Sequence, residues 1–76
     1  MQGFVARHKA EWEELEGLVR AARKSPARLS AADRRRLDVL YRRTATCLAR
    51  IDTRGDDGPL AAYLHGLVAA AHSVIY

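Results

Sequence analysis

The sequence has little of what would hold a small domain together covalently or anchor it in a membrane. Cys47 is the single cysteine among 76 residues, which excludes an internal disulfide framework and any zinc site built from several cysteines. Such sparse cysteine usage fits a reducing compartment. No signal-peptide pattern opens the chain, and the longest apolar stretch, within residues 67–75, is interrupted by His72 and Ser73. We therefore expect no segment that spans a bilayer.

Proline and aromatic residues are also scarce, and few residues are β-branched. The chain has two prolines and 7% aromatic residues, while alanine, leucine, arginine and glutamate dominate. These four are strong helix formers. With 49% hydrophobic and 29% charged residues, the composition is that of a globular chain. A chain of this length forms at most one domain and is too short for a large catalytic cleft.

Apolar residues recur at spacings of three and four in three segments, which predicts three amphipathic helices. The expected ranges are residues 2–24, 31–53 and 59–75. Because the connections are short, we predict an all-α fold, an antiparallel three-helix bundle in a single domain over residues 1–76. The predicted core consists of Phe4, His8, Trp12, Leu15, Leu37, Leu40, Tyr41, Leu48, Tyr63, Leu64, Leu67 and Ile75.

Capping residues mark where the second and third helices begin. Ser30 is an expected N-cap, with Asp33 at the position of a capping box. Asp57 or Gly58 is expected to cap the third helix. Pro59 then occupies its first position, where a missing N–H has no cost.

Positive charge gathers in the middle of the chain. Residues 20–54 hold eleven basic and three acidic side chains, although the whole chain has a net charge of +4. On the central predicted helix, arginines occupy the face opposite the apolar stripe, and three of them recur every seven residues. An ordinary solvated face is the alternative to a binding surface. The residues predicted to meet an anionic partner are Arg35, Arg36, Arg42, Arg43 and Arg50.

Three kinds of partner fit this arginine face. An acidic protein and an anionic lipid surface need no sequence code, and the lipid contributes about 1 kcal/mol per basic residue near it. A nucleic-acid-binding helical module is the alternative from a different class. A reading helix, however, normally mixes Asn, Gln, Ser and Lys among its arginines, and these are absent here.

The histidines and the cysteine give no catalytic or metal site. His65, His72 and Tyr76 share the rim of the third predicted helix, which makes them a second candidate interaction edge. No Glu-x-x-His pair or other ligand cluster accompanies them, so we expect neither a metal nor a cofactor. His8 is interpreted as a packed histidine, with a ligand or a pH-sensitive hinge as the alternative. Cys47 is interpreted as core filler, with a reactive thiol as the alternative.

The outward faces of the first and third predicted helices are also interpretable. Solubility alone accounts for the glutamates of the first helix, at positions 11, 13, 14 and 16. Small side chains on the back of the third helix permit another helix to approach closely, which makes self-association a candidate. These are Ala61, Ala62, Ala69 and Ala70.

Three groups of residues together carry a family resemblance. They are Phe4-Val5-Ala6-Arg7-His8 with Glu11-Trp12 and Leu15; Leu40-Tyr41-Arg42-Arg43 with Ala45 and Leu48-Ala49; and Tyr63-Leu64 with Leu67-Val68, Ala71-His72 and Ile75-Tyr76. In this order and spacing, the chain resembles the N-terminal cytoplasmic region of stage II sporulation protein M-like membrane proteins. Cys47 departs from the pattern, because an acidic residue is expected there.

The resemblance implies a membrane protein whose multi-helix membrane part follows this region, at the cytoplasmic side of the cell membrane. The sporulation member of the family is linked to septal cell-wall remodelling during engulfment. The resemblance implies a scaffold or assembly role and offers no catalytic residues. We therefore expect a non-enzymatic domain that binds a protein partner or itself, and no small-molecule substrate.

Overall fold

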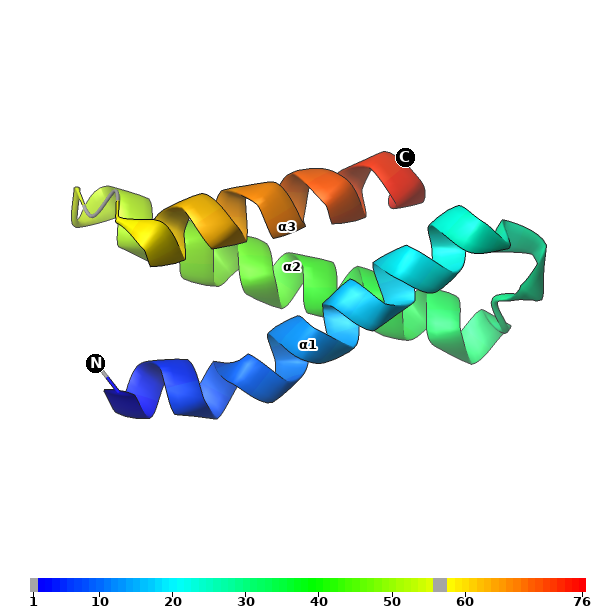
Figure 1. The fold of residues 1–76 in the computed structure, drawn as a ribbon, viewed down its shortest axis with the longest axis horizontal. Coiled ribbons are helices and arrows are strands. Elements are labelled where there is room, and N and C mark those ends of the chain that lie inside the picture. Colours follow the sequence, from blue (N-terminus) through cyan, green and yellow to red (C-terminus); the bar gives the residue numbers. More distant parts are fainter. Residues whose placement is uncertain (1, 56–57) are drawn as a thin grey trace.

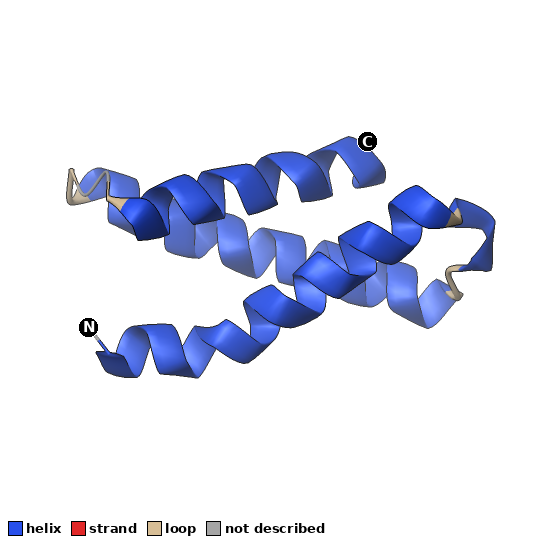
Figure 2. Cartoon of the chain, viewed as in Figure 1, coloured by secondary structure: helices blue, strands red, loops and turns tan. Residues whose placement is uncertain are grey.

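The computed structural model describes residues 2–55 and 58–76, with side chains from residue 5 onward. Its helices are α1 (Gln2–Lys24), α2 (Ala31–Thr53) and α3 (Pro59–Ile75), at the ranges that the periodicity predicts, and the described residues include no strand. In Figure 1, α1 runs from left to right, α2 returns from right to left, and α3 runs from left to right again; Figure 2 shows how short the connections are. The longest dimension is 38 Å, because a 23-residue helix is itself about 34 Å long. The predicted three-helix bundle is confirmed.

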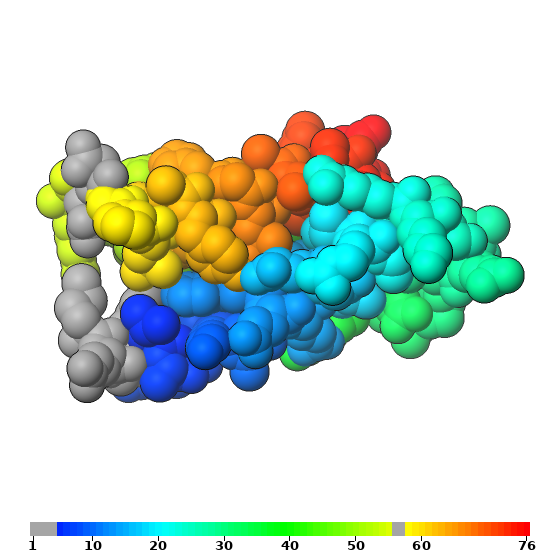
Figure 3. All heavy atoms as spheres, in the orientation of Figure 1, coloured from blue at the N-terminus to red at the C-terminus, as the bar shows by residue number. Residues whose placement is uncertain are grey.

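Each helix contributes one leucine with no exposed surface to a common core. These are Leu15, Leu40 and Leu64. Trp12, Leu37, Leu48 and Leu67 are buried around them, and Tyr41 and Ile75 pack against this cluster from its edge. Figure 3 shows side chains of α1 and α3 in contact along one face of the molecule. Burial of this seam, worth about 25 cal/mol per Å² of apolar surface, is what holds the helices together.

Two residues of α3 lie on other faces than the sequence predicted. Tyr63, predicted in the core, is 39% exposed at the α1–α3 rim, whereas Ala61, predicted on the outer back, is 3% exposed. The reason is helical geometry: neighbouring residues point about 100° apart, and residues three apart share a face. Leu64 occupies the centre, so Tyr63 falls on the flank and Ala61 turns inward. Of the alanine back, only Ala62 and Ala69 are exposed.

The helix ends follow the expected capping chemistry. Ser30 caps α2 by accepting a hydrogen bond from the Asp33 N–H at 3.0 Å. Gly58 precedes Pro59 as the cap residue of α3. Gly55, just after α2, has φ of +74°, a left-handed conformation that glycine adopts without strain.

The connection between α1 and α2 differs in detail from the expected loop. Pro26–Arg28 forms a single 3-10 turn, η1, closed by a hydrogen bond from the Leu29 N–H to the Pro26 carbonyl. Proline fixes the backbone angle that starts such a turn. The prediction that Phe4 belongs to the core concerns a side chain that the structure does not describe, and Asp57, a predicted cap of α3, lies outside the described residues.

Replacing a fully buried leucine should be far more damaging than shortening its exposed neighbour. We expect Leu40→Ala to lower the free energy of unfolding by about 2–5 kcal/mol, because it leaves a cavity at the centre of the core. Val39, adjacent in the chain and 43% exposed, is the control. Val39→Ala should change the free energy of unfolding by less than about 0.5 kcal/mol. Urea denaturation followed by circular dichroism measures both. Equal losses would contradict the assigned face of α2.

Candidate interaction surfaces

The arginine row of α2, which consists of Arg36, Arg43 and Arg50, runs beside the acidic half of α1. Arg36 donates two hydrogen bonds to the Glu14 carboxylate, at 2.8 and 2.9 Å. This two-pronged geometry is the strongest arrangement for these two groups. The hydrogen bond to Arg36 lowers the pKa of the Glu14 carboxyl, and the same bond raises the pKa of Arg36. Water screens the pair, because both side chains are 43% exposed.

Two further arginines of the predicted interaction face are also paired. Arg43 lies 3.0 Å from a Glu11 carboxylate oxygen, across the α1–α2 interface. Arg42 lies 3.1 Å from Asp38, one turn earlier on α2 itself. The expectation of a wholly outward-looking face therefore needs correction, because Arg36 and Arg43 join α2 to α1. Solubility alone likewise does not account for the glutamates of α1.

Arg35 and Arg50 differ from these three. Both are exposed, and neither makes an ion pair or a side-chain hydrogen bond within residues 2–55 and 58–76. Arg50 continues the arginine row toward the N-terminal part of α1. Glu11 is the first acidic residue of the chain, so α1 offers no carboxylate beyond it. The positive charge of Arg50 is therefore uncompensated by α1.

Beside Arg50, the outer face of α2 is hollowed where its side chains are small. Thr46, Ala49 and Thr53 line an open depression of about 360 Å³ together with Arg50 and Arg54. The two threonine hydroxyls donate back to carbonyls of α2, at 3.0 and 2.7 Å. The floor of this depression therefore offers few free polar groups, and the two guanidinium groups provide its charge.

Cys47 lies under the arginine row and is 7% exposed. Burial raises the pKa of its thiol, although the neighbouring Arg50 and Arg43 act in the opposite direction. Little thiolate is therefore present at neutral pH, and the thiolate is the reactive form. The position fits core filler better than a nucleophile.

The predicted edge of His65, His72 and Tyr76 divides into two places. The rings of His72 and Tyr76 lie 4.9 Å apart, and both lie within about 6.3 Å of the Tyr41 ring. His65 instead lies about two turns earlier on α3, 3.2 Å from Asp52. Because α2 and α3 are antiparallel, successive positions along one rim of α3 meet earlier and earlier residues of α2. The aromatic edge therefore consists of Tyr41, His72 and Tyr76, without His65.

His8 and Tyr63 belong to a second aromatic group, around the buried Trp12. The His8 ring stacks on Trp12 at 5.9 Å, and Tyr63 meets Trp12 edge-on at 6.2 Å. His8 also lies 3.7 Å from Glu11, so it is packed beside a carboxylate. The Tyr63 hydroxyl donates to the Glu16 carboxylate. Burial, and then this hydrogen bond, raise the pKa of Tyr63.

Two kinds of site are absent from the described part of the chain. No three His, Cys, Asp or Glu side chains gather there as metal ligands would. No helix there combines the length and the apolar character that crossing a membrane requires.

Comparison with known proteins identifies the family. One family model matches residues 2–76 of the chain. The chain belongs to the DUF8413 family. This family is described as a domain of unknown function, so membership adds no activity to the structural description. No curated protein and no solved structure matches the chain. The resemblance of this DUF8413 domain to stage II sporulation protein M-like proteins stays a prediction.

The pair between α1 and α2 predicts a pH-dependent stability. Because the pKa of Glu14 is lower in the folded chain, its charge stabilises the fold above the unfolded pKa of about 4.3. This stabilisation is lost as the pH falls through the folded pKa. We expect Glu14→Gln to lower the melting temperature near neutral pH, and the difference from wild type to vanish at strongly acidic pH.

Glu13→Gln is the matched control for this experiment, because Glu13 is exposed on the same helix and makes no ion pair among the described residues. It should change the melting temperature less. A double-mutant cycle with Arg36→Gln isolates the pair itself. A coupling free energy of zero near neutral pH would contradict the pairing.

The buried thiol predicts slow alkylation. In native buffer near neutral pH, we expect iodoacetamide to modify Cys47 at least about a hundredfold more slowly than in concentrated urea, because the helices must open to expose a thiolate. Mass spectrometry at timed intervals gives both rates. Comparable rates in the two solutions would show an accessible thiol.

Proposed function

We propose that this domain is a non-enzymatic docking module at the cytoplasmic face of a membrane, where it binds a negatively charged partner. The observation that carries the proposal is the division within the arginine face. Arg36 and Arg43 serve the fold, while Arg35 and Arg50 are exposed without an ion pair among the described residues. A cation that does not stabilise its own bundle is available to an external anion.

The shape of α2 supports the same conclusion. The depression between Thr46, Ala49 and Thr53 lets a flat partner approach the helix backbone closely. Arg50 and Arg54 stand beside it, where they meet the partner's charge. Arginine suits this task because its planar fork pairs with both carboxylate and phosphate groups. The membrane location and the role in assembling the cell envelope rest on the family resemblance alone.

Binding to anionic vesicles tests the proposal. We expect the domain to co-sediment with vesicles that contain phosphatidylglycerol and not with neutral phosphatidylcholine vesicles. Replacing the two unpaired arginines of the predicted interaction face, in Arg35→Ser with Arg50→Ser, should weaken partitioning roughly thirtyfold, since each basic residue contributes about 1 kcal/mol at such a surface.

A matched variant removes the same charge elsewhere. Lys9 and Arg20 line grooves between α1 and α3, away from the arginine row. Lys9→Ser with Arg20→Ser should weaken partitioning much less. Equal losses of partitioning in both variants would show that net charge alone, and not the arginine face, causes binding. Equal co-sedimentation with neutral and anionic vesicles would remove the anionic lipid surface as partner. Tighter binding to duplex DNA than to vesicles, with a steep loss at rising salt, would favour the nucleic-acid class instead.

A further inference from the structure

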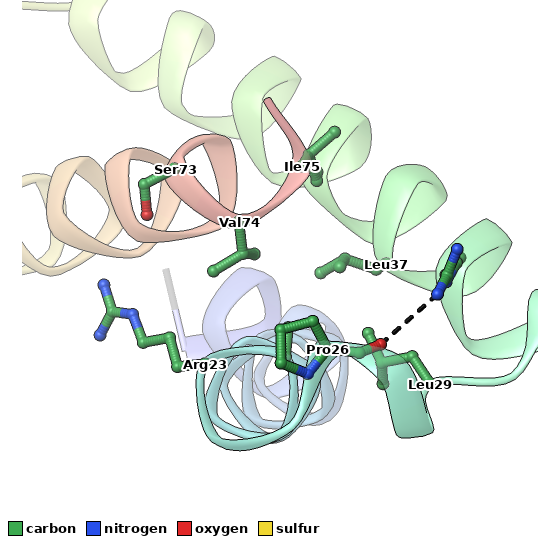
Figure 4. A pocket seen from close by; sticks show the side chains of 9 residues that line it. Arg23, Pro26, Leu29, Leu37, Ser73, Val74 and Ile75 are labelled. Carbon is green, nitrogen blue, oxygen red and sulfur yellow. Dashed lines mark hydrogen bonds between the residues drawn. The ribbon is translucent and has the colours of Figure 1, made fainter.

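A pocket lies at the end of the bundle where α1 passes into η1. It has a volume of about 570 Å³ and is lined by residues of every helix: Ala22, Arg23, Pro26, Leu29, Arg34, Leu37, Ser73, Val74 and Ile75. Figure 4 shows Val74, Leu37, Pro26 and Leu29 arranged around one open space between the C-terminal turns of α1 and α3 and the start of α2. Six of the nine lining side chains are apolar, so the pocket is mainly a hydrocarbon surface.

This end of the bundle is strongly cationic. Residues 20–36 hold seven basic side chains and one acidic side chain. Arg36 is engaged by Glu14, and Arg34 donates one hydrogen bond, at 3.4 Å, to the Pro26 carbonyl. Arg23 also lines the pocket, but Figure 4 shows its guanidinium group pointing away from the open space, on the side opposite the hydrogen bond to Pro26. A guanidinium group has five N–H donors, so Arg34 keeps several free for a ligand.

The size of the pocket favours a small ligand over a protein segment. A specific protein interface takes about 20–30 residues on each side, and an α-helix with its side chains is about 10–12 Å wide. Nine lining residues at one end of a bundle are too few for either. A volume near 570 Å³ instead lies within the range of small-molecule pockets, about 300–1,000 Å³.

We propose that this pocket binds a single-chain anionic amphiphile, with its alkyl chain against Leu29, Leu37 and Val74 and its carboxylate on Arg34, whose guanidinium group lies at the rim beside Pro26. An apolar floor with a guanidinium group at its rim is what such a molecule requires. The proposal is independent of the docking function, because it concerns a monomeric ligand and the opposite end of α2 from Arg50.

Heteronuclear NMR titration with decanoate below its micelle concentration tests this assignment. We expect saturable shifts confined to the amides of residues 22–37 and 73–75. Affinity should rise about two- to fourfold per methylene from hexanoate to decanoate, as chain burial requires. Decyl maltoside, with the same chain and a neutral head, should bind at least about fivefold more weakly than decanoate.

A matched pair of variants tests the role of the guanidinium group. Arg34→Gln should weaken decanoate binding roughly tenfold. Arg23→Gln makes the same charge change at a side chain whose guanidinium group points away from the pocket, and should leave affinity within about twofold. Unchanged spectra of wild type in the decanoate titration would overturn the proposal, as would equal losses in the two variants or shifts spread over all basic segments. Binding of phosphatidylglycerol vesicles without any response to decanoate would also overturn it, while leaving the docking proposal intact.

Discussion

Everything else in this structure depends on the three-way burial of Leu15, Leu40 and Leu64. A chain of 76 residues buries only about 60% of the surface that it exposes when unfolded, so its apolar contacts must be concentrated in one core. One narrow seam must hold three helices, each by a single stripe. Residues beside that stripe are consequently forced onto rims, where aromatic rings and ion pairs meet. The candidate sites lie on these rims, at the helix ends or on the outer face of α2.

The ion pairs between α1 and α2 change the meaning of the arginine face. Arg36, Arg43 and Arg50 follow one another at intervals of seven residues. Arg36 and Arg43 nevertheless bind Glu14 and Glu11 within the molecule. The same residue type at one repeat thus serves two purposes, and the neighbouring helix decides which. The uneven charge of the chain favours this pairing, since α1 supplies the acidic side chains and α2 supplies the basic ones. The positive charge of this face that remains available to a partner is therefore smaller than the composition suggests, and it is localised at Arg35 and Arg50.

The fold was predictable because its determinants are local. Apolar spacing fixes the stripe of each helix, Ser30 and Pro59 fix where two of them begin, and short connections leave few ways to pack three helices. The two wrong predictions of burial, for Tyr63 and Ala61, concern residues at the borders of the apolar stripe of α3. The apolar spacing predicts Tyr63 in the core together with Leu64, although Leu64 already occupies the central direction. The row of alanines predicts Ala61 on the outer back, although it lies three residues before Leu64.

By itself, then, the sequence determined the helix ranges, the buried leucines and the concentration of positive charge on α2, since each depends on residues a few positions apart. Only the tertiary structure decided which arginines pair with α1, that His65 meets Asp52 while His72 meets Tyr41, and that a pocket forms beside η1. Those outcomes depend on how the antiparallel helices are aligned along one another. Alignment is set by the interlocking of side chains far apart in the chain, which no local pattern encodes.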